Sequence, residues 1–358
     1  GVNRANYMEE NKANIDFEGK EAMYGEVYFL RAYYYFELVK FFGDVPLFTE
    51  ARLTAGQAGT LTRTPKDEVY AQIELDLQNA IASLPNSQSQ VGRVNKYTAY
   101  ALLGKVLLYQ DKFAEAASAL DNVIGVYSLV SDYGSQFLRF GENGPESVFE
   151  IQYSNQSNWY DWGCAHCSEG NYAIIMNGPR GWSGPEYAQG WSFNVPTEEF
   201  YNSFEEGDSR RDATVLDIEA FAAATGASYT EGYDHTGYFN NKYIPRAGES
   251  GGQTELNYLT NFRIIRYSDV LLMAAEAYNR GGIDDGLAQE FLNQVRRRAF
   301  GGDDNDISAS GSALTDAIWE ERKFELSLEG HRFFDLVRTG RASSLIAGFV
   351  EGKHEVFP

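Results

Sequence analysis

The sequence predicts a mostly α-helical protein in which helical hairpins form a scaffold and a loop-rich insert carries short strands. Two observations lead to this fold class. Apolar side chains recur at helical spacing in several stretches before residue 125 and again after residue 265. Between these stretches, residues 154–193 are rich in Gly, Ser, Asn, Trp and Tyr without a sustained period, which is typical of loops.

The first of the predicted helices covers residues 26–42. Its apolar stripe includes Leu30, Tyr34 and Leu38, and further aromatic side chains fill much of the other side. We therefore expect this helix to be buried nearly all round. Gly43 is a natural C-terminal stop for it.

A second helix is predicted from Thr64 to Pro85, and a helical hairpin follows at residues 96–125. Small residues in that hairpin, Gly104 among them, allow two helices to approach closely, as in a tetratricopeptide repeat. Residues 270–299 repeat the same order of small and large residues. Two such matches predict stacked helical hairpins of the tetratricopeptide type.

The insert is the loop-rich part between the helical stretches. Near its start, Phe149 and Ile151 alternate with polar residues, which indicates a short half-buried strand with these two side chains inside. A helix is expected to begin at Thr197. The predicted division is an N-terminal helical part, a ligand-binding insert and a C-terminal helical part that completes the scaffold, at residues 1–130, 131–259 and 260–358.

Composition bounds the class of protein. The chain has 358 residues and a net charge of −21, and a field of that sign repels phosphate, so nucleic acid is not expected as a partner. No run of 18 apolar residues occurs, so no transmembrane helix is predicted. No signal peptide is recognisable, and the chain begins and stops within a pattern, so we expect both ends to be trimmed.

Both cysteines of the chain, Cys164 and Cys167, lie in the stretch NWYDWGCAHCSEGNY at residues 158–172. A structural zinc site needs four ligands, and the sequence offers no second Cys pair or His pair at a suitable spacing. A local disulfide or two free thiols is therefore favoured over metal or redox chemistry. We predict no metal and no cofactor.

Catalytic signatures are not evident in the sequence. HExxH, P-loop and GxGxxG patterns do not occur. The 51 Asp and Glu residues would allow carboxylate pairs for a glycoside hydrolase, but a count of this size has no force on its own. No catalytic residue is predicted.

One charged block near the C-terminus invites a catalytic interpretation. Glu321, Glu325 and Glu329 would lie on one face of a helix, with Arg322 in reach of Glu325. Aromatic and aliphatic residues are interleaved with these charges. We therefore interpret the block as a paired ionic network that braces the fold.

The tryptophans point to a binding surface. Four of the five lie between residues 159 and 191, and the stretch 158–172 offers few aliphatic partners. A flat indole matches the C–H face of a pyranose ring, and neighbouring amides and carboxylates can bond its hydroxyls. The predicted ligand residues are Asn158, Trp159, Tyr160, Asp161, Trp162 and Trp182. Trp191, beside the predicted helix start, is expected to belong to the framework.

Several longer stretches follow one another in a recognisable order. They are GEVYFLRAYYYFELVKFFGDVPL, ESVFEIQYS, RYSDVLLMAAEAYNRGG and, as the most specific, ERKFELSLEGHRFFDLVRTGRA. Together they resemble the SusD/RagB family of surface nutrient-binding lipoproteins of Bacteroidetes. The resemblance implies a tetratricopeptide-like scaffold and a non-catalytic, surface-exposed outer-membrane lipoprotein. It also implies that the protein captures glycans for a SusC-like TonB-dependent transporter.

The site residues are not carried over from this family, whose ligand residues vary, and the lipid-bearing N-terminal cysteine is not in this sequence. Three alternatives stay open. The first is capture of a peptide or another nutrient, in which Arg180 and Asp161 could serve. The second is a glycoside hydrolase on a helical scaffold. The third is an interaction scaffold, which a buried tryptophan cluster would favour.

Overall fold

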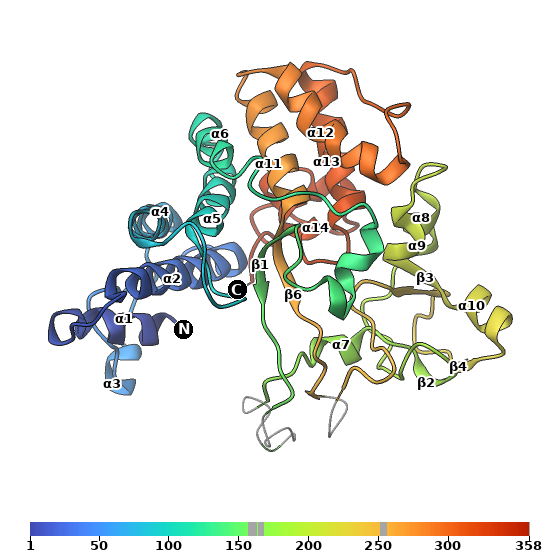
Figure 1. The fold of residues 1–358 in the computed structure, drawn as a ribbon, viewed down its shortest axis with the longest axis horizontal. Helices are drawn as coiled ribbons and strands as arrows, with labels where there is room; N and C mark the ends of the chain where they lie inside the picture. Colours follow the sequence, from blue (N-terminus) through green and yellow to red (C-terminus); the bar gives the residue numbers. More distant parts are fainter. Residues whose placement is uncertain (157–162, 164–167, 251–255, 358) are drawn as a thin grey trace. The chain divides into compact units, whose positions relative to one another are not determined.

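The computed structural model of the chain describes residues 1–156, 163, 168–250 and 256–357 (Figure 1). The chain falls into two compact units that are discontinuous in sequence. Unit 1 comprises Gly1–Val126, Met273–Ala288 and Arg332–Pro358, and unit 2 comprises Tyr127–Leu272 and Gln289–His331. The three-part division made from the sequence is a different partition of the chain and stays a prediction.

Unit 1 is helical. Its elements are α1 (Val2–Glu10), η1 (Lys12–Asn14), α2 (Lys20–Phe42), α3 (Ala55–Ala58), α4 (Lys66–Ser83), α5 (Lys96–Leu108), α6 (Phe113–Asp121), α14 (Arg332–Arg338) and α15 (Ala342–Leu345). α2 packs on α4, α4 on α5, and α5 on α6. α2 ends at Gly43, as predicted, where φ is 66° and a side chain would be strained.

Unit 2 carries the short strands and several short helices. The strands pair antiparallel, β1 (Ser147–Ile151) with β6 (Phe262–Arg266), β2 (Arg180–Ser183) with β4 (Ser228–Thr230), and β3 (Val215–Asp217) with β5 (Tyr238–Asn240). Its helices are η2 (Tyr133–Phe137), η3 (Arg139–Gly141), α7 (Ala173–Met176), α8 (Glu198–Asn202), α9 (Arg210–Thr214), α10 (Ile218–Thr225) and α13 (Gly311–Leu326). α8 begins after Thr197, as predicted, whose side chain accepts a hydrogen bond from the backbone N–H of Phe200 (3.1 Å).

Two further helices, α11 (Tyr267–Arg280) and α12 (Asp285–Phe300), contribute residues to both units. They are the helices of the second predicted hairpin, and α5 and α6 are those of the first. The predicted fold class, a mostly α-helical protein with tetratricopeptide-like hairpins and a few short strands, is confirmed.

α2 buries one face rather than its whole surface. Leu30, Tyr34 and Leu38 remain 38%, 37% and 36% exposed, so the predicted burial nearly all round is wrong for this stripe. The face that meets α1 and α4 instead carries Arg31. Its guanidinium donates to Asn6 of α1 (3.1 Å) and to Asp76 of α4 (2.6 Å), and these pairings fix which side of the helix turns inward.

α5 and α6 approach closely at Gly104. A Cβ atom on this glycine would lie 2.5 Å from Cγ of Leu120 and 2.6 Å from its Cδ2. Side chains do not tolerate such distances, so the small residue predicted from the sequence is what permits the contact between the two helices.

Replacing Gly104 with alanine should therefore lower the free energy of unfolding by about 1–3 kcal/mol, because overpacking outweighs the gain of about 1 kcal/mol that alanine brings to an open helix. Urea denaturation of both proteins measures the difference. Gly56→Ala in α3 is the matched control, because a Cβ there meets nothing within 4 Å. Equal stabilities of the two variants would contradict the steric argument.

β1 has the opposite burial to that predicted. Val148 and Glu150 are buried, whereas Phe149 and Ile151 are half-buried. The reason is that Glu150 finds polar partners inside: its carboxylate accepts a hydrogen bond from Asn261 Nδ2 (3.1 Å). A satisfied carboxylate can occupy the inner face, which the alternation of apolar residues alone does not reveal.

Buried tyrosines give the fold a predicted alkaline limit. Burial raises the pKa of Tyr70, Tyr187 and Tyr258 to about 12. The unfolded chain releases these protons near pH 10, before the folded protein does. The unfolded state therefore binds fewer protons between about pH 10 and pH 12, and stability must fall over that window.

Lys242 acts in the opposite direction at lower pH. Burial lowers its pKa to about 8, against the attraction of Glu329. Between about pH 8 and pH 10.5 the unfolded state holds a proton that the folded state lacks, so stability rises with pH.

We therefore expect a shallow rise in the free energy of unfolding above pH 8 and a steep fall above pH 10. Urea midpoints at a series of pH values measure this. Tyr258→Phe should reduce the fall by the share of one tyrosine. A free energy that stays flat between pH 10 and pH 12 would contradict the assignment.

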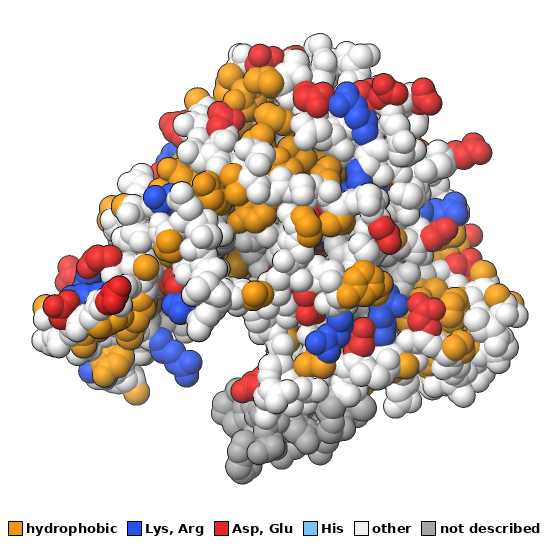
Figure 2. Space-filling view, viewed as in Figure 1, with side chains coloured by type: hydrophobic (Ala, Val, Ile, Leu, Met, Phe, Trp, Pro, Cys, Tyr) orange, Lys and Arg blue, Asp and Glu red, His pale blue; other side chains and the backbone are white. Residues whose placement is uncertain are grey.

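The visible face carries hydrophobic side chains as well as charged side chains of both signs (Figure 2). Figure 2 shows carboxylates distributed over the visible face, in keeping with the net charge of −21. Among the described residues, no helix is both long and apolar enough to cross a membrane.

Candidate functional site

The tryptophan-rich loop was the strongest functional signal in the sequence. Five of its predicted ligand residues, Asn158, Trp159, Tyr160, Asp161 and Trp162, lie outside the described residues, and so do Cys164 and Cys167. Their predicted roles stay predictions. What the structure describes is the base of this loop and the surface of unit 2 that carries it.

The base of the loop is a closed neck. The backbone N–H of Ser154 donates to the carbonyl of Glu169 (2.9 Å), and its hydroxyl donates to the Glu169 carboxylate (2.7 Å). The Ser168 hydroxyl donates to the carbonyl of Leu256 (2.6 Å), and the N–H of Asn171 donates to the carbonyl of Tyr258 (2.7 Å). The two ends of the loop therefore leave unit 2 side by side, from a backbone that is fixed.

Directly after the neck, α7 holds a second segment. The backbone N–H of Trp191 donates to the carbonyl of Ile175 (2.9 Å), and that of Phe193 donates to the carbonyl of Met176 (2.8 Å). Arg180 donates from Nε to the carbonyl of Trp191 (2.8 Å). Residues 190–193 are thus fastened to the C-terminal end of α7.

These contacts display an aromatic strip, which we define as Tyr172, Trp191 and Phe193. Tyr172 immediately precedes α7 and is 48% exposed, and Phe193 is 51% exposed. The Trp191 and Phe193 rings are perpendicular at 6.2 Å between centroids, and the Arg180 guanidinium lies 5.9 Å from the Phe193 ring centroid. α7 has four residues, or about 6 Å of helix, so the members of the strip are held near the loop neck.

Backbone strain accompanies this segment. Glu186, Ser192 and Asn194 have φ values of 67°, 58° and 53°, in a backbone region that residues other than glycine seldom occupy. Such conformations persist where the surroundings hold them in place, and they often gather at binding sites. The strained backbone indicates that the surrounding structure holds this segment in one conformation.

Trp191 has the framework role expected from the sequence. It is half-buried and packs against a core cluster made of Tyr133, Phe137, Ile174, Ile175, Tyr243 and Tyr258. Tyr172 and Phe193 are not among the ligand residues predicted from the sequence. They carry the same signal as the tryptophans, an aromatic side chain in loop composition, and Tyr172 lies in the stretch 158–172 itself.

Trp182, the sixth predicted ligand residue, lies in the core. It is 9% exposed and packs with Tyr187 and Phe221, each 5.9 Å away between ring centroids. Its Nε1 has no hydrogen-bond partner in the part of the chain that the structure describes. A covered ring offers no face to a sugar, so a role of Trp182 in binding stays a prediction that this burial does not favour.

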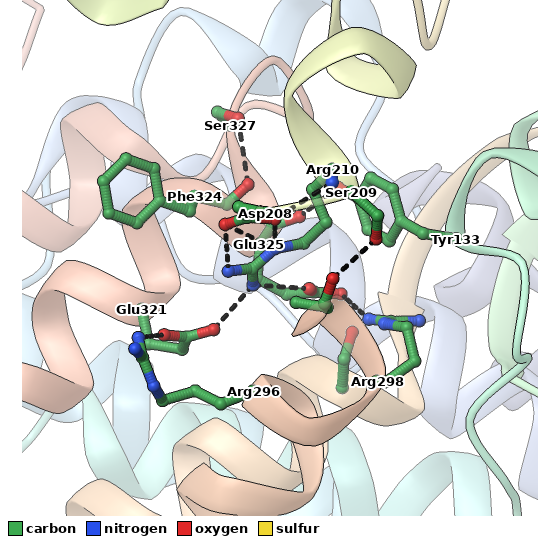
Figure 3. A network of polar contacts seen from close by, with 12 residues as sticks. Tyr133, Asp208, Ser209, Arg210, Arg296, Arg298, Glu321, Phe324, Glu325 and Ser327 are labelled. Atoms are coloured by element: carbon green, nitrogen blue, oxygen red, sulfur yellow. Dashed lines mark hydrogen bonds and ion pairs between the residues drawn. The ribbon is translucent and has the colours of Figure 1, made fainter. Parts of the chain in front are cut away.

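The charged block at the C-terminus forms a buried ionic network in unit 2 (Figure 3). Its bases are Arg210, Lys242, Arg266, Arg296 and Arg298, and its acids are Glu146, Asp208, Glu321, Glu325 and Glu329. The buried bases and acids named here are equal in number, and Arg296 also pairs with the partly exposed Glu205 (3.1 Å), so burial leaves little net charge. The structural interpretation made from the sequence agrees with this arrangement.

The predicted helical face is wrong for Glu329, and the block has partners beyond those in local reach. Arg322 donates to Asp269 (2.8 Å), at the start of α11. α13 ends at Leu326, so Glu329 does not lie on the same helix as Glu325. It reaches the network from the following turn, where it binds Lys242 (2.7 Å). The carboxylates find long-range partners because they face the interior.

No group of three or more His, Cys, Asp or Glu side chains suited to a metal ion occurs among the described residues. The acidic turn at residues 301–308 instead places Asp306 against Arg297 (2.5 Å). The functional features of unit 2 are therefore a fixed loop neck, an exposed aromatic strip and a charge-balanced interior. Exposed aromatic side chains beside a fixed loop neck are typical of a binding surface.

The family models identify the class of binder. Residues 145–354 match the model described as the SusD family, and residues 3–108 match one described as starch-binding and associating with the outer membrane. The chain belongs to the SusD family.

Curated relatives and solved structures agree with this assignment. SusD-like protein P2 of Formosa agariphila is 32% identical over 351 residues, covering 92% of this chain and 66% of the relative. SusD-like protein P38 of the same organism is 27% identical, and the match covers 95% of this chain and 70% of that relative. The chain thus spans about two thirds of the length of these relatives.

Among solved structures, a laminarin-binding SusD-like protein superposes with a TM-score of 0.90 at 38% identity, covering 100% of this chain and 80% of that one. Surface glycan-binding protein A from Bacteroides thetaiotaomicron, in complex with laminarihexaose, gives a TM-score of 0.85 at 31% identity and covers 96% and 75% of the two chains.

Proposed function

We propose that this protein is a non-catalytic glycan-binding protein that captures oligo- or polysaccharide at the cell surface for import by a SusC-like TonB-dependent transporter. The observation that supports it most is the similarity, at 38% and 31% identity, to structures described as binding laminarin or laminarihexaose. The display of aromatic side chains around the loop neck supplies a chemical reason for the same conclusion.

The ligand we propose is a neutral glycan. The exposed rings of Tyr172 and Phe193 can cover C–H faces of sugars, and the predicted ligand loop adds Trp159 and Trp162. The net charge of −21 disfavours polyanions. A neutral β-glucan such as laminarin fits these properties.

Anchoring and partnership belong to the same proposal. The N-terminal family model is described as associating with the outer membrane, which supports a surface-exposed location. A lipid anchor and delivery to a SusC-like transporter are inferred from the family resemblance.

Direct binding tests this function. In affinity electrophoresis, laminarin in the gel should retard the protein, whereas alginate, an anionic polysaccharide, should not. Prolonged incubation with laminarin should release no new reducing ends. Equal retardation by both polymers would contradict the neutral-ligand proposal, and a steady release of reducing ends would favour the hydrolase alternative.

A further inference from the structure

We propose that unit 2 has a second saccharide-binding site, separate from the aromatic strip, which accepts one ring of a neutral glycan. It is a surface hollow of about 530 Å³, which we call the Tyr127 hollow. It is lined by residues 127–131 together with Tyr267, Gln294, Arg297 and Arg298. The inference rests on the proposed function in that it takes the ligand to be a glycan.

The size and floor of the hollow suit a sugar ring. Small-ligand sites commonly measure about 300–1,000 Å³, so a volume of about 530 Å³ lies within that range. Tyr127 is half-buried and Tyr267 is buried, and their rings are tilted by 38° with centroids 6.4 Å apart. Tyr127 therefore has part of its ring open to solvent beside a buried aromatic support, as a stacking contact requires.

The wall of the hollow is a preorganised polar loop. The N–H of Ser128 donates to the carbonyl of Pro145 (3.1 Å), and the N–H of Val130 donates to the Glu146 carboxylate (3.0 Å). Ser128 and Ser131 are exposed, so their hydroxyls can face a ligand. A fixed loop loses little conformational entropy on binding, which favours even a weak ligand.

The charges around the hollow point to a neutral ligand. Arg297 is already paired with Asp306 (2.5 Å) and Glu290 (3.1 Å), and Arg298 with Glu146 (3.2 Å) and Glu325 (2.6 Å). Neither guanidinium has an uncompensated charge to offer to a phosphate, sulfate or carboxylate.

One donor below the hollow is nevertheless unsatisfied. The Arg298 side chain is 4% exposed, and its Nε has no hydrogen-bond partner among the residues that the structure describes. Buried donors are seldom left without a partner. Arg298 is one of the residues that line the hollow, so a ligand hydroxyl that reaches this N–H from the hollow would satisfy it. Aromatic stacking, hydroxyl-bearing walls and an orphan donor together match a polyol rather than an ion.

A second site would matter for long chains more than for short ones. Once one part of a polysaccharide is bound at the first site, the second contact forms at an effective concentration set by the connecting length. With a weak second site, we expect a gain of about two- to tenfold for the polymer. Such a contact would help the protein to hold a long glycan.

Two variants of the hollow test the proposal. Tyr127→Ala removes the ring on which a sugar would stack. Ser131→Leu places a larger side chain at an exposed position of the hollow and so narrows it, and leucine offers no flat face for stacking. Tyr233→Ala is the matched control, because this tyrosine of unit 2 is 93% exposed and does not line the hollow. Each change is made in the native sequence and in a Trp159→Ala/Trp162→Ala background. Thermal melts confirm that every variant is folded.

Binding is measured with two probes: retardation by laminarin in gels, and saturation-transfer NMR with laminarihexaose. In the native background, Tyr127→Ala and Ser131→Leu should weaken laminarin binding by about two- to tenfold, and Tyr233→Ala should not. In the double-tryptophan background, the residual saturation transfer should fall in the two hollow variants and stay unchanged in Tyr233→Ala.

The outcomes separate the two proposals. If the hollow variants match Tyr233→Ala in both backgrounds, the second site is wrong, whatever the tryptophan variants do. If the tryptophan replacements have no effect while the hollow variants lose binding, the second site stands and the tryptophan loop is wrong as the main platform. Absence of binding to either probe by the native protein would overturn the inference together with the proposed function.

Discussion

Replacing Glu325 with glutamine is expected to lower the free energy of unfolding by about 3–5 kcal/mol, among the largest effects of any single change in this chain. Glu325 is fully buried, and three guanidinium groups converge on its carboxylate. Arg298 and Arg266 donate to Oε1 (2.6 and 2.9 Å), and Arg210 donates to Oε2 (3.1 Å). Glutamine is neutral, so the replacement removes one negative charge and leaves part of the arginine charge uncompensated. The protein interior cannot solvate that charge.

The same argument predicts the acid limit of the fold. Burial would raise the pKa of Glu325, but the charges of Arg298, Arg266 and Arg210 outweigh it and hold the pKa well below its usual value. A depressed folded pKa contributes stability that is present above the unfolded value of about 4.3 and is lost as the pH falls towards the folded pKa. Glu325→Gln should remove that part of the acid dependence.

Urea denaturation at pH 7 and at pH 4 tests both statements. Glu320→Gln is the matched control on the same helix, because Glu320 is half exposed and its pair with Lys323 (2.6 Å) is worth at most about 1 kcal/mol. A Glu325→Gln protein that unfolds at the same urea concentration as the control would show that the network does not stabilise the fold.

The network also shows how far local reasoning extends. The sequence identified the acidic block and its structural role, because charges interleaved with aromatic residues are visible in one stretch. It could not identify the partners. Arg210 and Arg266 lie 115 and 59 residues away from Glu325, and helical spacing carries no information on such separations. Helical spacing points only to the nearest base, Arg322, and does not reveal that this arginine also reaches Asp269 (2.8 Å).

The helical scaffold was predictable because its signals are periodic and local. Gly104 and its repeat marked the hairpins, and Gly43 and Thr197 marked helix ends. Where the outcome depended on neighbours, prediction failed. The stripe on α2 remained partly exposed because the face that carries Arg31 meets α1 and α4.

The site was harder to predict because a loop has no period to read. Trp182 appeared in the same loop composition as the other tryptophans, yet it is covered by Tyr187 and Phe221, the latter on α10 some 40 residues later. Phe193 escaped notice because its exposure results from backbone contacts with α7 that no local pattern encodes. The aromatic content of the sequence indicates the region of the candidate site. Which aromatic rings are exposed depends on tertiary packing, which the local sequence does not reveal.

The second large expected effect concerns glycan binding by the two predicted ligand tryptophans, Trp159 and Trp162. Trp159→Ala and Trp162→Ala should each weaken binding of laminarihexaose by about five- to thirtyfold, and the double replacement by about thirtyfold or more. An indole can bury about 150–250 Å², of which a sugar ring covers roughly half. At about 25 cal/mol per Å² this contributes roughly 2.5 kcal/mol, and ordering of sugar and loop leaves about 1–2 kcal/mol per tryptophan.

Stability distinguishes a platform from a core. If Trp159 and Trp162 present their faces to sugar, their replacement should change the free energy of unfolding by no more than about 0.5 kcal/mol. Trp182→Ala is the matched comparison, because its ring is 9% exposed and packed between aromatic neighbours. It should cost about 3–5 kcal/mol of stability, while the folded fraction keeps its affinity.

Calorimetric titration with laminarihexaose and a thermal melt of each variant therefore give opposite patterns for the two kinds of tryptophan. Loss of affinity at a constant melting temperature assigns Trp159 and Trp162 to the ligand surface. A large drop in melting temperature with affinity retained would assign them to the framework. In that case binding would rest on the aromatic strip and the Tyr127 hollow, since Tyr172 and Phe193 already have about half of their surface open to a ligand.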